Sequence, residues 1–155
     1  MIRLFKPEDA KKASNLIARA LREVNAKDYD EEYIEADVRA LSSDNLIKRA
    51  ENNHLYICER EEKIVGIGGI GAYWFKEDES RLMNIFVLPD YLGQGIGTEI
   101  VKAIEQDIYF TRAKRIEVPS SITAAGFYLK LGYQFKNGIK EIDKDRLYRL
   151  EKFNE

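Results

Sequence analysis

The sequence predicts a single α/β domain built on a mixed, mostly antiparallel sheet of six or seven strands with helices on both faces. Residues 54–59 and 63–70 have the composition of two strands joined by a short polar turn, and a third strand at 82–87 would extend them into an antiparallel meander. A glycine-rich turn at 93–97 then leads through a periodic helix to a strand at 113–118. This second pattern is typical of one right-handed βαβ unit.

The N-terminal third is predicted to be mainly helical. Residues 2–5 alternate as a short first strand, and the acids after Pro7 open a helix whose apolar face continues to Val24. Residues 45–53 indicate another short helix. Residues 28–37 are dense in acids, which predicts either a solvated helix face or a segment that lines the mouth of an acceptor site and attracts a cationic amine.

The C-terminal third is predicted to return to the sheet. The expected elements are a helix at 98–109, the strand at 113–118, a helix at 122–131, and strands at 133–135 and 146–150. Gly132 would end the second helix as a left-handed cap. The last two strands would form a hairpin over a loop at Asn137 and Gly138.

Composition restricts the classes of protein to consider. The 155 residues suit one domain, residues 1–155, and the net charge of −2 gives no general reason to expect a nucleic-acid partner. No apolar run reaches the roughly 18–20 residues that span a bilayer, so no membrane segment is expected. The first residues lack the apolar stretch of a signal peptide, and one cysteine excludes an internal disulfide. A cytoplasmic monomer or homodimer is expected.

The glycine turn is the strongest functional signal. Pro89 closes the strand before it, and glycines at 93, 95 and 97 let the backbone turn tightly at the start of a helix. Free N–H groups and the positive end of the helix dipole make such a turn an anion site, here for a pyrophosphate. A dinucleotide-binding βαβ unit is the rival, with Glu117 near the position of its acidic residue. The meander before the turn argues against that rival, because a doubly wound parallel sheet alternates strands with helices.

These residues resemble the GNAT superfamily of acetyl-CoA-dependent N-acetyltransferases. The turn at 87–97 is similar to the family pattern V-x-P-x-x-R/Q-G-x-G-I/L-G, and residues 124–133 are similar to A-x-x-F/L-Y-x-K-L-G-F/Y. The chain departs from the family at Leu92, where Arg or Gln is usual, and at Ser121, where Asn is frequent. The first departure leaves the backbone amides in place, and the second would weaken one contact to the pantetheine arm.

The resemblance implies a GNAT-like fold and transfer of an acetyl group from acetyl-CoA to a primary amine, by direct attack in a ternary complex. The acceptor would be an amine-bearing small molecule or peptide, and no metal is expected. The coenzyme would be bound by residues of the third meander strand, the glycine turn and the later helix: Ile85, Phe86, Val87, Leu92, Gly93, Gln94, Gly95, Ile96, Gly97, Thr98, Ser121, Ala124, Phe127 and Tyr128. The alternative function is a non-catalytic acyl-CoA-binding regulatory module.

Two residues are expected to carry the chemistry. Tyr128 matches the tyrosine that the family uses to protonate the leaving thiolate, although an aromatic residue on this helix could instead belong to the core. Glu117 precedes a valine as in some N-terminal acetyltransferases of the superfamily, which implies a general base; it could instead be solvent-facing or ion-paired. Glu79 and Asp78 are the fallback bases. Backbone N–H groups near residues 85–87 would stabilise the oxyanion.

The remaining reactive and aromatic residues are not expected to have a catalytic role. His54 and Cys58 are the only histidine and cysteine, too few to build a metal site. Cys58 falls inside an apolar strand, which favours a packed thiol over a nucleophile. The aromatic residues 73–75 would either cover the core or form a wall of the acceptor pocket.

Overall fold

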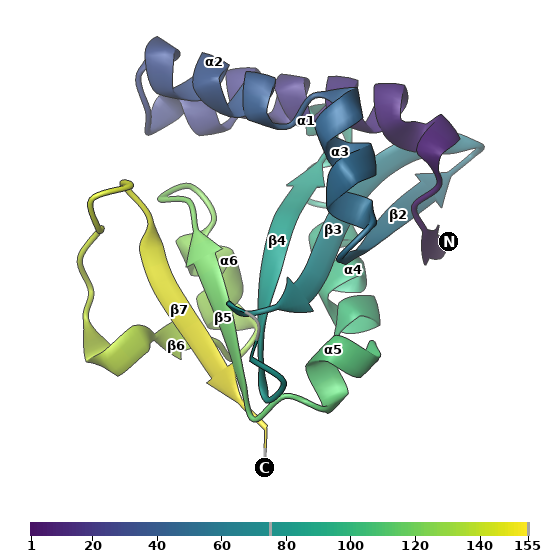
Figure 1. Ribbon diagram of the computed structural model, residues 1–155. Helices are drawn as coiled ribbons and strands as arrows, with labels where there is room; N and C mark the ends of the chain where they lie inside the picture. The colour runs from purple at the N-terminus through teal and green to yellow at the C-terminus, as the bar shows by residue number, and fades with distance from the viewer. Residues whose placement is uncertain (75, 155) are drawn as a thin grey trace.

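A seven-stranded mixed sheet forms the centre of the molecule in the order β1-β2-β3-β4-β5-β7-β6 (Figure 1). The computed structural model describes residues 1–74 and 76–154, so Phe75 of the aromatic group at 73–75 lies outside the described residues. The strands are β1 (Ile2–Leu4), β2 (His54–Arg60), β3 (Lys63–Ala72), β4 (Glu79–Val87), β5 (Arg115–Ser120), β6 (Gln134–Phe135) and β7 (Tyr148–Phe153). Only β4 and β5 pair in parallel; the other neighbours are antiparallel. The predicted fold class is confirmed.

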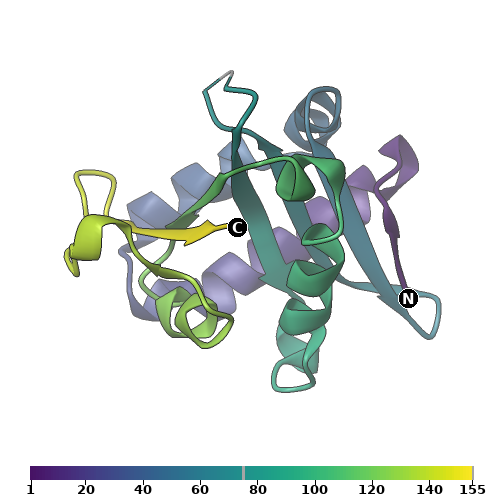
Figure 2. The ribbon, with the colours of Figure 1, turned by 90° about the horizontal axis from the view of Figure 1, so that it is seen from below.

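Helices cover both faces of this sheet. One layer contains α1 (Ala10–Glu23), α2 (Glu31–Ala40) and α3 (Ser43–Ala50), and the other contains α4 (Ile96–Ile104), α5 (Ile108–Thr111) and α6 (Ala125–Lys130). Figure 2 shows the first layer behind the sheet and the second in front of it. None of the helices in the described part of the chain is both long enough and apolar enough to cross a membrane.

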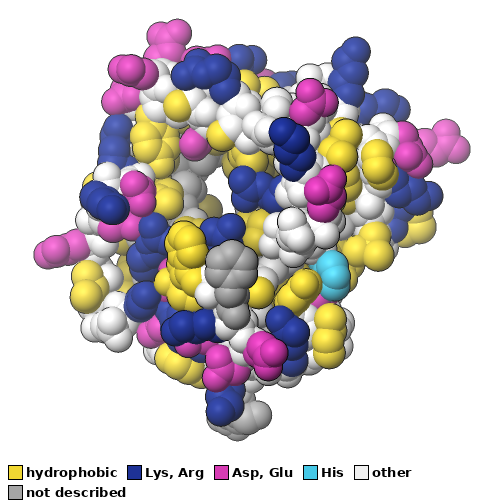
Figure 3. Space-filling view, viewed as in Figure 1, with side chains coloured by type: hydrophobic (Ala, Val, Ile, Leu, Met, Phe, Trp, Pro, Cys, Tyr) yellow, Lys and Arg dark blue, Asp and Glu magenta, His cyan; other side chains and the backbone are white. Residues whose placement is uncertain are grey.

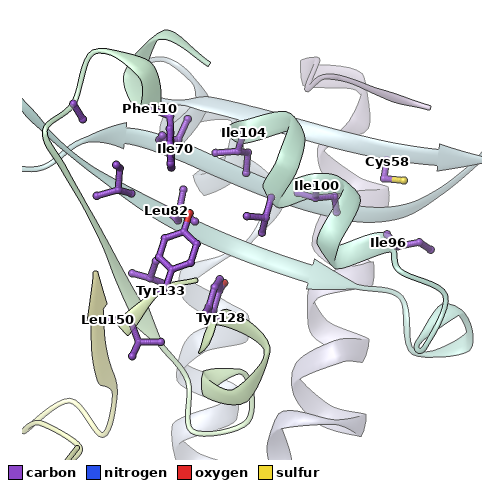
Figure 4. Packing of buried hydrophobic residues seen from close by; sticks show 14 of the residues in the cluster. Cys58, Ile70, Leu82, Ile96, Ile100, Ile104, Phe110, Tyr128, Tyr133 and Leu150 are labelled. Atoms are coloured by element: carbon purple, nitrogen blue, oxygen red, sulfur yellow. The ribbon is translucent and has the colours of Figure 1, made fainter. Parts of the chain in front are cut away.

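Each face of the sheet has its own apolar core. Ile96, Ile100 and Ile104 of α4 recur at every fourth position and pack against Ile70 and Leu82 of the sheet (Figure 4). Burying each of these side chains completely contributes about 1.5–3 kcal/mol. On the other face, one stripe of α1 packs on β3 with residues of α2 and α3: Ala13, Leu16, Ile17, Leu21, Ile34 and Leu46. The two cores fix the two helical layers on the sheet between them.

The sheet opens between β4 and β5. The parallel ladder joins only residues 79–81 to residues 115–117, and after it the two strands diverge. On its other side β4 carries a bulge, because Ile67 pairs with Phe86 while Gly69 pairs with Met83. Asn84 in this bulge has a positive φ of 55°. The middle of the sheet therefore contains both a gap and an irregular strand.

Several predicted boundaries were wrong. The expected helix at 98–109 is divided, because the Asp107 side chain accepts a hydrogen bond from the Tyr109 N–H and starts a separate helix, α5. The helix expected from residue 122 begins at Ala125. The final strands do pair, but the whole segment 136–147 joins them, not a tight loop at Asn137 and Gly138. This segment is held by the Asp143 carboxylate, which accepts N–H bonds from residues 145 and 147.

Candidate active site

A cavity of about 600 Å³ lies where β4 and β5 diverge. The hollow is visible in Figure 3 between the upper helical layer and the C-terminal strands. Its walls come from α1, α2, α3, β4, the glycine turn, the end of β5 and α6. Predicted coenzyme residues that line it are Ile85, Phe86, Val87, Leu92, Gly93, Gly95, Ile96, Gly97, Thr98, Ser121, Ala124, Phe127 and Tyr128. Gln94 is exposed and does not line it.

The glycine turn forms the N-terminal end of α4 as the sequence indicates. Gly93 and Gly95 have φ values of 78° and 79°, and Gly95 is the residue that caps the helix. A side chain at either position would be strained in this left-handed conformation. The first N–H groups of α4 have no partner within the helix, so this end of the cavity favours an anion.

Backbone groups of β4 border the same cavity. From Leu82 to Val87 the edge of β4 that faces β5 has no strand partner, because the parallel ladder ends at Arg81. Unpaired peptide groups at a buried edge are costly, and an amide-bearing ligand can satisfy them by adding to the edge as a strand does. The bulge also leaves Asn84 Oδ1 buried without a hydrogen-bond partner among the described residues.

Tyr128 lies on α6 and lines the cavity, although its side chain is only 5% exposed. Its ring makes edge contacts with Phe127 and Tyr133, with centroid distances of 5.1 and 5.9 Å. Burial raises the pKa of the Tyr128 hydroxyl above its ordinary value, so the phenol carries its proton at neutral pH. Figure 4 shows Tyr128 near Tyr133. A protonated, immobilised hydroxyl at a cavity wall can act as an acid.

Glu117, in contrast, lies outside the cavity lining and is 1% exposed. Its carboxylate is bound by Arg115, by Lys136 Nζ at 2.9 Å and by Arg149 Nη1 at 3.6 Å. Burial alone would raise the pKa of Glu117, but the hydrogen bonds from Arg115 and Lys136 outweigh burial and hold it below the ordinary value. A carboxylate stabilised in this way is a weak base and is closed to a substrate. The geometry therefore favours the ion-paired alternative for Glu117, and the role of general base stays a prediction.

The fallback bases also lie away from the cavity lining. Glu79 binds Arg115 at 2.9 Å and Lys76 at 3.4 Å, and Asp78 is exposed at the end of the loop, directly before β4. Tyr73 covers this group of charges, because Arg115 and Lys136 lie 5.5 and 5.9 Å from its ring centroid. Tyr73 thus covers an ion-pair cluster, while the neighbouring Trp74 is 70% exposed.

The only carboxylate among the described residues that line the cavity is that of Asp37, on α2. Burial raises the pKa of Asp37. Tyr33, one turn earlier, also lines the cavity, and burial followed by the charge of Asp37 raises its pKa to about 12. The sequence pointed to the acidic segment 28–37 but could not select Asp37 from it. Other acids of the segment have partners elsewhere: Asp28 binds Thr123, Asp30 binds Arg146, and Glu35 binds Arg22.

A polar bridge joins Tyr29, just before α2, to the loop before α6 and to the segment before β7. Tyr29 Oη donates to the Arg146 carbonyl and accepts from the Ile122 N–H, both at 2.8 Å. Tyr33 stacks on Tyr29, and the Arg146 guanidinium lies over both rings. Two distant parts of the chain line the cavity near this bridge, with Tyr33 on α2 and Leu147 in the segment before β7.

The remaining reactive side chains lie elsewhere. His54 Nδ1 is 2.7 Å from Asp107 Oδ2, the carboxylate that also caps α5. Cys58 is buried, and burial raises the pKa of its thiol, which disfavours the thiolate. The described residues contain no group of three or more metal-ligating side chains.

Comparison with known proteins supports the fold described above and the family resemblance of the sequence. A family model described as an acetyltransferase (GNAT) domain matches residues 17–146. An uncharacterized N-acetyltransferase of Methanocaldococcus jannaschii is 36% identical over 104 residues, 61% of this chain and 45% of that protein. This chain therefore spans less than half of that relative's length.

Two solved structures have the same fold over nearly the whole chain. The PaiA N-acetyltransferase of Thermoplasma acidophilum, solved in complex with coenzyme A, has a TM-score of 0.83 at 18% identity, covering 99% of this chain and 98% of that one. A GCN5-related N-acetyltransferase of Rhodopseudomonas palustris has a TM-score of 0.79 at 25% identity, covering 99% and 95%. The family model matches most of this chain, and the two sequence patterns of the family meet at one cavity. The chain therefore belongs to the GNAT acetyltransferase family.

Proposed function

We propose that this protein transfers an acetyl group from acetyl-CoA to a primary amine by direct attack in a ternary complex. The observation that carries the proposal is the meeting of three features in one cavity: the glycine turn, the unpaired edge of β4 and the residue Tyr128. The two sequence blocks that supply them are far apart in the chain. The family relation and the coenzyme A bound to the Thermoplasma protein support the same donor.

The donor would occupy the side of the cavity formed by the glycine turn and α6. Its pyrophosphate would bind the free N–H groups at the start of α4, and its amide-bearing arm would pair with the edge of β4 between Leu82 and Val87. Ser121 and Ala124 would border the arm from the other side. This placement directs the thioester toward the bulge in β4.

The acetyl transfer has three chemical requirements. The amine nitrogen forms a bond to the thioester carbonyl carbon, the carbonyl oxygen becomes an oxyanion, and the carbon–sulfur bond then breaks. N–H groups of β4 near the bulge would stabilise the oxyanion, a contribution of about 3–4 kcal/mol for each well-placed donor. The Tyr128 hydroxyl would give its proton to the departing thiolate, whose ordinary pKa as a thiol is about 8.5. The phenolate would regain a proton from the attacking nitrogen, which must lose one more proton to become an amide.

Asp37 would bind the amine before the reaction. A free alkyl ammonium has a pKa of about 10.4, and desolvation in the cavity lowers that value while it raises the pKa of Asp37. Both shifts reduce the cost of moving a proton from the ammonium to the carboxylate. Because the chain places no other carboxylate among the described lining residues, Asp37 is the acid group best placed to accept that proton.

Two measurements test the proposal. Calorimetry should detect binding of acetyl-CoA and of coenzyme A to the purified protein, and NADH should not bind. Thiol release should then be followed with a panel that contains an alkyl amine, a polyamine, an amino acid and a peptide with a free N-terminus. Acetyl-CoA binding with no turnover on any amine would support the non-catalytic alternative, and the absence of coenzyme binding would exclude both functions.

A further inference from the structure

We propose that the acceptor is a small amine that also carries a carboxylate or a phosphate group, that Arg49 binds this anionic group, and that the nearby charge of Arg81 strengthens the binding. The inference rests on the proposed function and names the chemical class of its second substrate. It is carried by an arginine in the cavity wall whose positive charge no described protein group neutralises.

Arg49 lies in the last turn of α3 and lines the cavity. Its Nη1 contacts Met83 Sδ at 3.9 Å, and Met83 immediately precedes the bulge in β4. A thioether sulfur is only a weak acceptor, whereas a guanidinium has five N–H donors. Among the residues that the structure describes, no carboxylate pairs with Arg49. Most of its donors are therefore available to a ligand.

Arg81 adds a second positive charge beside the first. It lies two residues before Met83 on β4, and alternate residues of a strand face the same side of the sheet. Because Met83 contacts Arg49, this alternation places Arg81 on the same side of the sheet as Arg49. Burial first, and then the charge of Arg81, lowers the pKa of Arg49. Two like charges near a partly buried site favour the binding of an anion.

The acids beside Arg81 on the sheet are already engaged. Glu79, Glu117 and Glu151 all bind one residue, Arg115. Their charge is therefore shared with a cation that is closer to them than Arg81 is. In the space-filling view, Lys and Arg side chains border the hollow (Figure 3).

The negative charge of Asp37 and the positive charges of Arg49 and Arg81 favour an acceptor with opposite charges at its two ends. Arginine binds carboxylates and phosphates with two parallel hydrogen bonds, and Arg49 is free to do so. Asp37 lines the same cavity, and among the described residues it forms no ion pair with Arg49, so the two groups are available to different parts of a ligand. A polyamine would place a cation beside Arg49 and is disfavoured.

A binding experiment tests this inference without turnover. The protein is saturated with coenzyme A so that the glycine turn is occupied, and four amines are titrated by calorimetry. The pairs are 3-aminopropanoate with propylamine, and 2-aminoethyl phosphate with 2-aminoethanol. At least one amine that carries an anionic group should bind about tenfold more tightly than its partner without that group, as expected for hydrogen bonds to a charged group. The pair with the larger difference identifies carboxylate or phosphate.

Variants show whether Arg49 is responsible. Arg49→Gln should reduce the preference for the anionic amine to about twofold, and Arg81→Gln should reduce it partially, because only Arg49 borders the cavity. Arg39→Gln is the matched control, since Arg39 is exposed on α2 and does not line the cavity. Arg49→Lys keeps the charge but loses the planar fork, and should retain part of the preference. The lysine variant keeps the test valid if the glutamine variant does not fold.

The inference would be overturned if the two amines of each pair bound equally, or if a triamine bound more tightly than the amines that carry an anionic group. It would also be overturned if Arg49→Gln lost the same affinity for both amines of a pair, or if neither amine with an anionic group bound at millimolar concentration. Because these titrations do not depend on catalysis, a protein that binds the anionic amine but transfers no acetyl group would count against the proposed function alone.

Discussion

A methyl group at Gly97 would lie 3.1 Å from Cζ of Phe127 and 3.2 Å from its Cε1. This close approach joins the first turn of α4 to α6 at the wall of the cavity. The glycine is therefore required by the space available, whereas Gly95 in the same turn is required by its backbone conformation.

The first prediction concerns Gly97→Ala. Alanine favours the helix by up to about 1 kcal/mol, which offsets the displacement of the Phe127 ring, so the free energy of unfolding should change little. Affinity for coenzyme A, measured by calorimetry, should fall about tenfold, because the new methyl group occupies space beside the anion-binding N–H groups. Gly126→Ala is the control, since a Cβ there meets no atom within 4 Å. Equal affinities for the two variants would contradict the prediction.

The second prediction concerns the acid. Tyr128→Phe keeps the ring packing but removes the proton donor, so kcat should fall about 10²–10³-fold while coenzyme A affinity stays within a few-fold. Tyr133→Phe is the matched control, because the Tyr133 hydroxyl donates to Glu105 at 3.0 Å and does not line the cavity. That variant should lower Tm and leave kcat nearly unchanged. Unchanged turnover in Tyr128→Phe would remove its proposed role.

The third prediction concerns the ion-pair cluster. Glu117→Gln removes the buried negative charge that Arg115, Lys136 and Arg149 share, and should reduce the free energy of unfolding by about 2–4 kcal/mol, measured by urea denaturation at neutral pH. The kcat of the folded variant should remain close to that of the parent protein. A loss of turnover near a thousandfold with normal stability would restore Glu117 as a base.

The pKa of Glu117 also gives this variant a pH signature. Because the pKa is lower in the folded chain than in the unfolded chain, the carboxylate stabilises the fold above its unfolded pKa of about 4.3. That stabilisation is lost as the pH falls through the folded pKa. The difference in stability between the parent protein and Glu117→Gln should therefore shrink in acid.

The fourth prediction concerns the proposed amine site. Asp37→Asn should lower kcat/KM for the amine about 10–100-fold without changing affinity for coenzyme A. Burial raises the pKa of Asp37, so ionisation of this carboxyl costs stability as the pH rises, and Asp37→Asn should be as stable as the parent protein or more stable at neutral pH. Glu32→Gln, at an exposed position of the same helix, is the control for activity. Equal acceptor kinetics in the two variants would contradict the assignment.

The sequence predicted the order of strands and helices because periodicity and turn residues are local signals. The bulge at Asn84 was not predicted, since residues 82–87 have the pattern of an uninterrupted strand. Local patterns also could not show that Lys136 and Arg149 converge on Glu117, because both come from later parts of the chain. Arg49 was missed for the same reason. It is one of several charged residues on a short helix, and only the packing of α3 against β4 gives it a special position.

The hydroxyl of Tyr29 has a further consequence for how the two substrates influence each other. It holds the loop that begins α6 through Ile122 and the segment before β7 through Arg146. The first borders the half of the cavity proposed for the donor, and the second borders the half proposed for the acceptor. A single phenol thus couples the two loops mechanically, because a displacement of either loop must stretch its hydrogen bond to Tyr29 or carry the other loop with it.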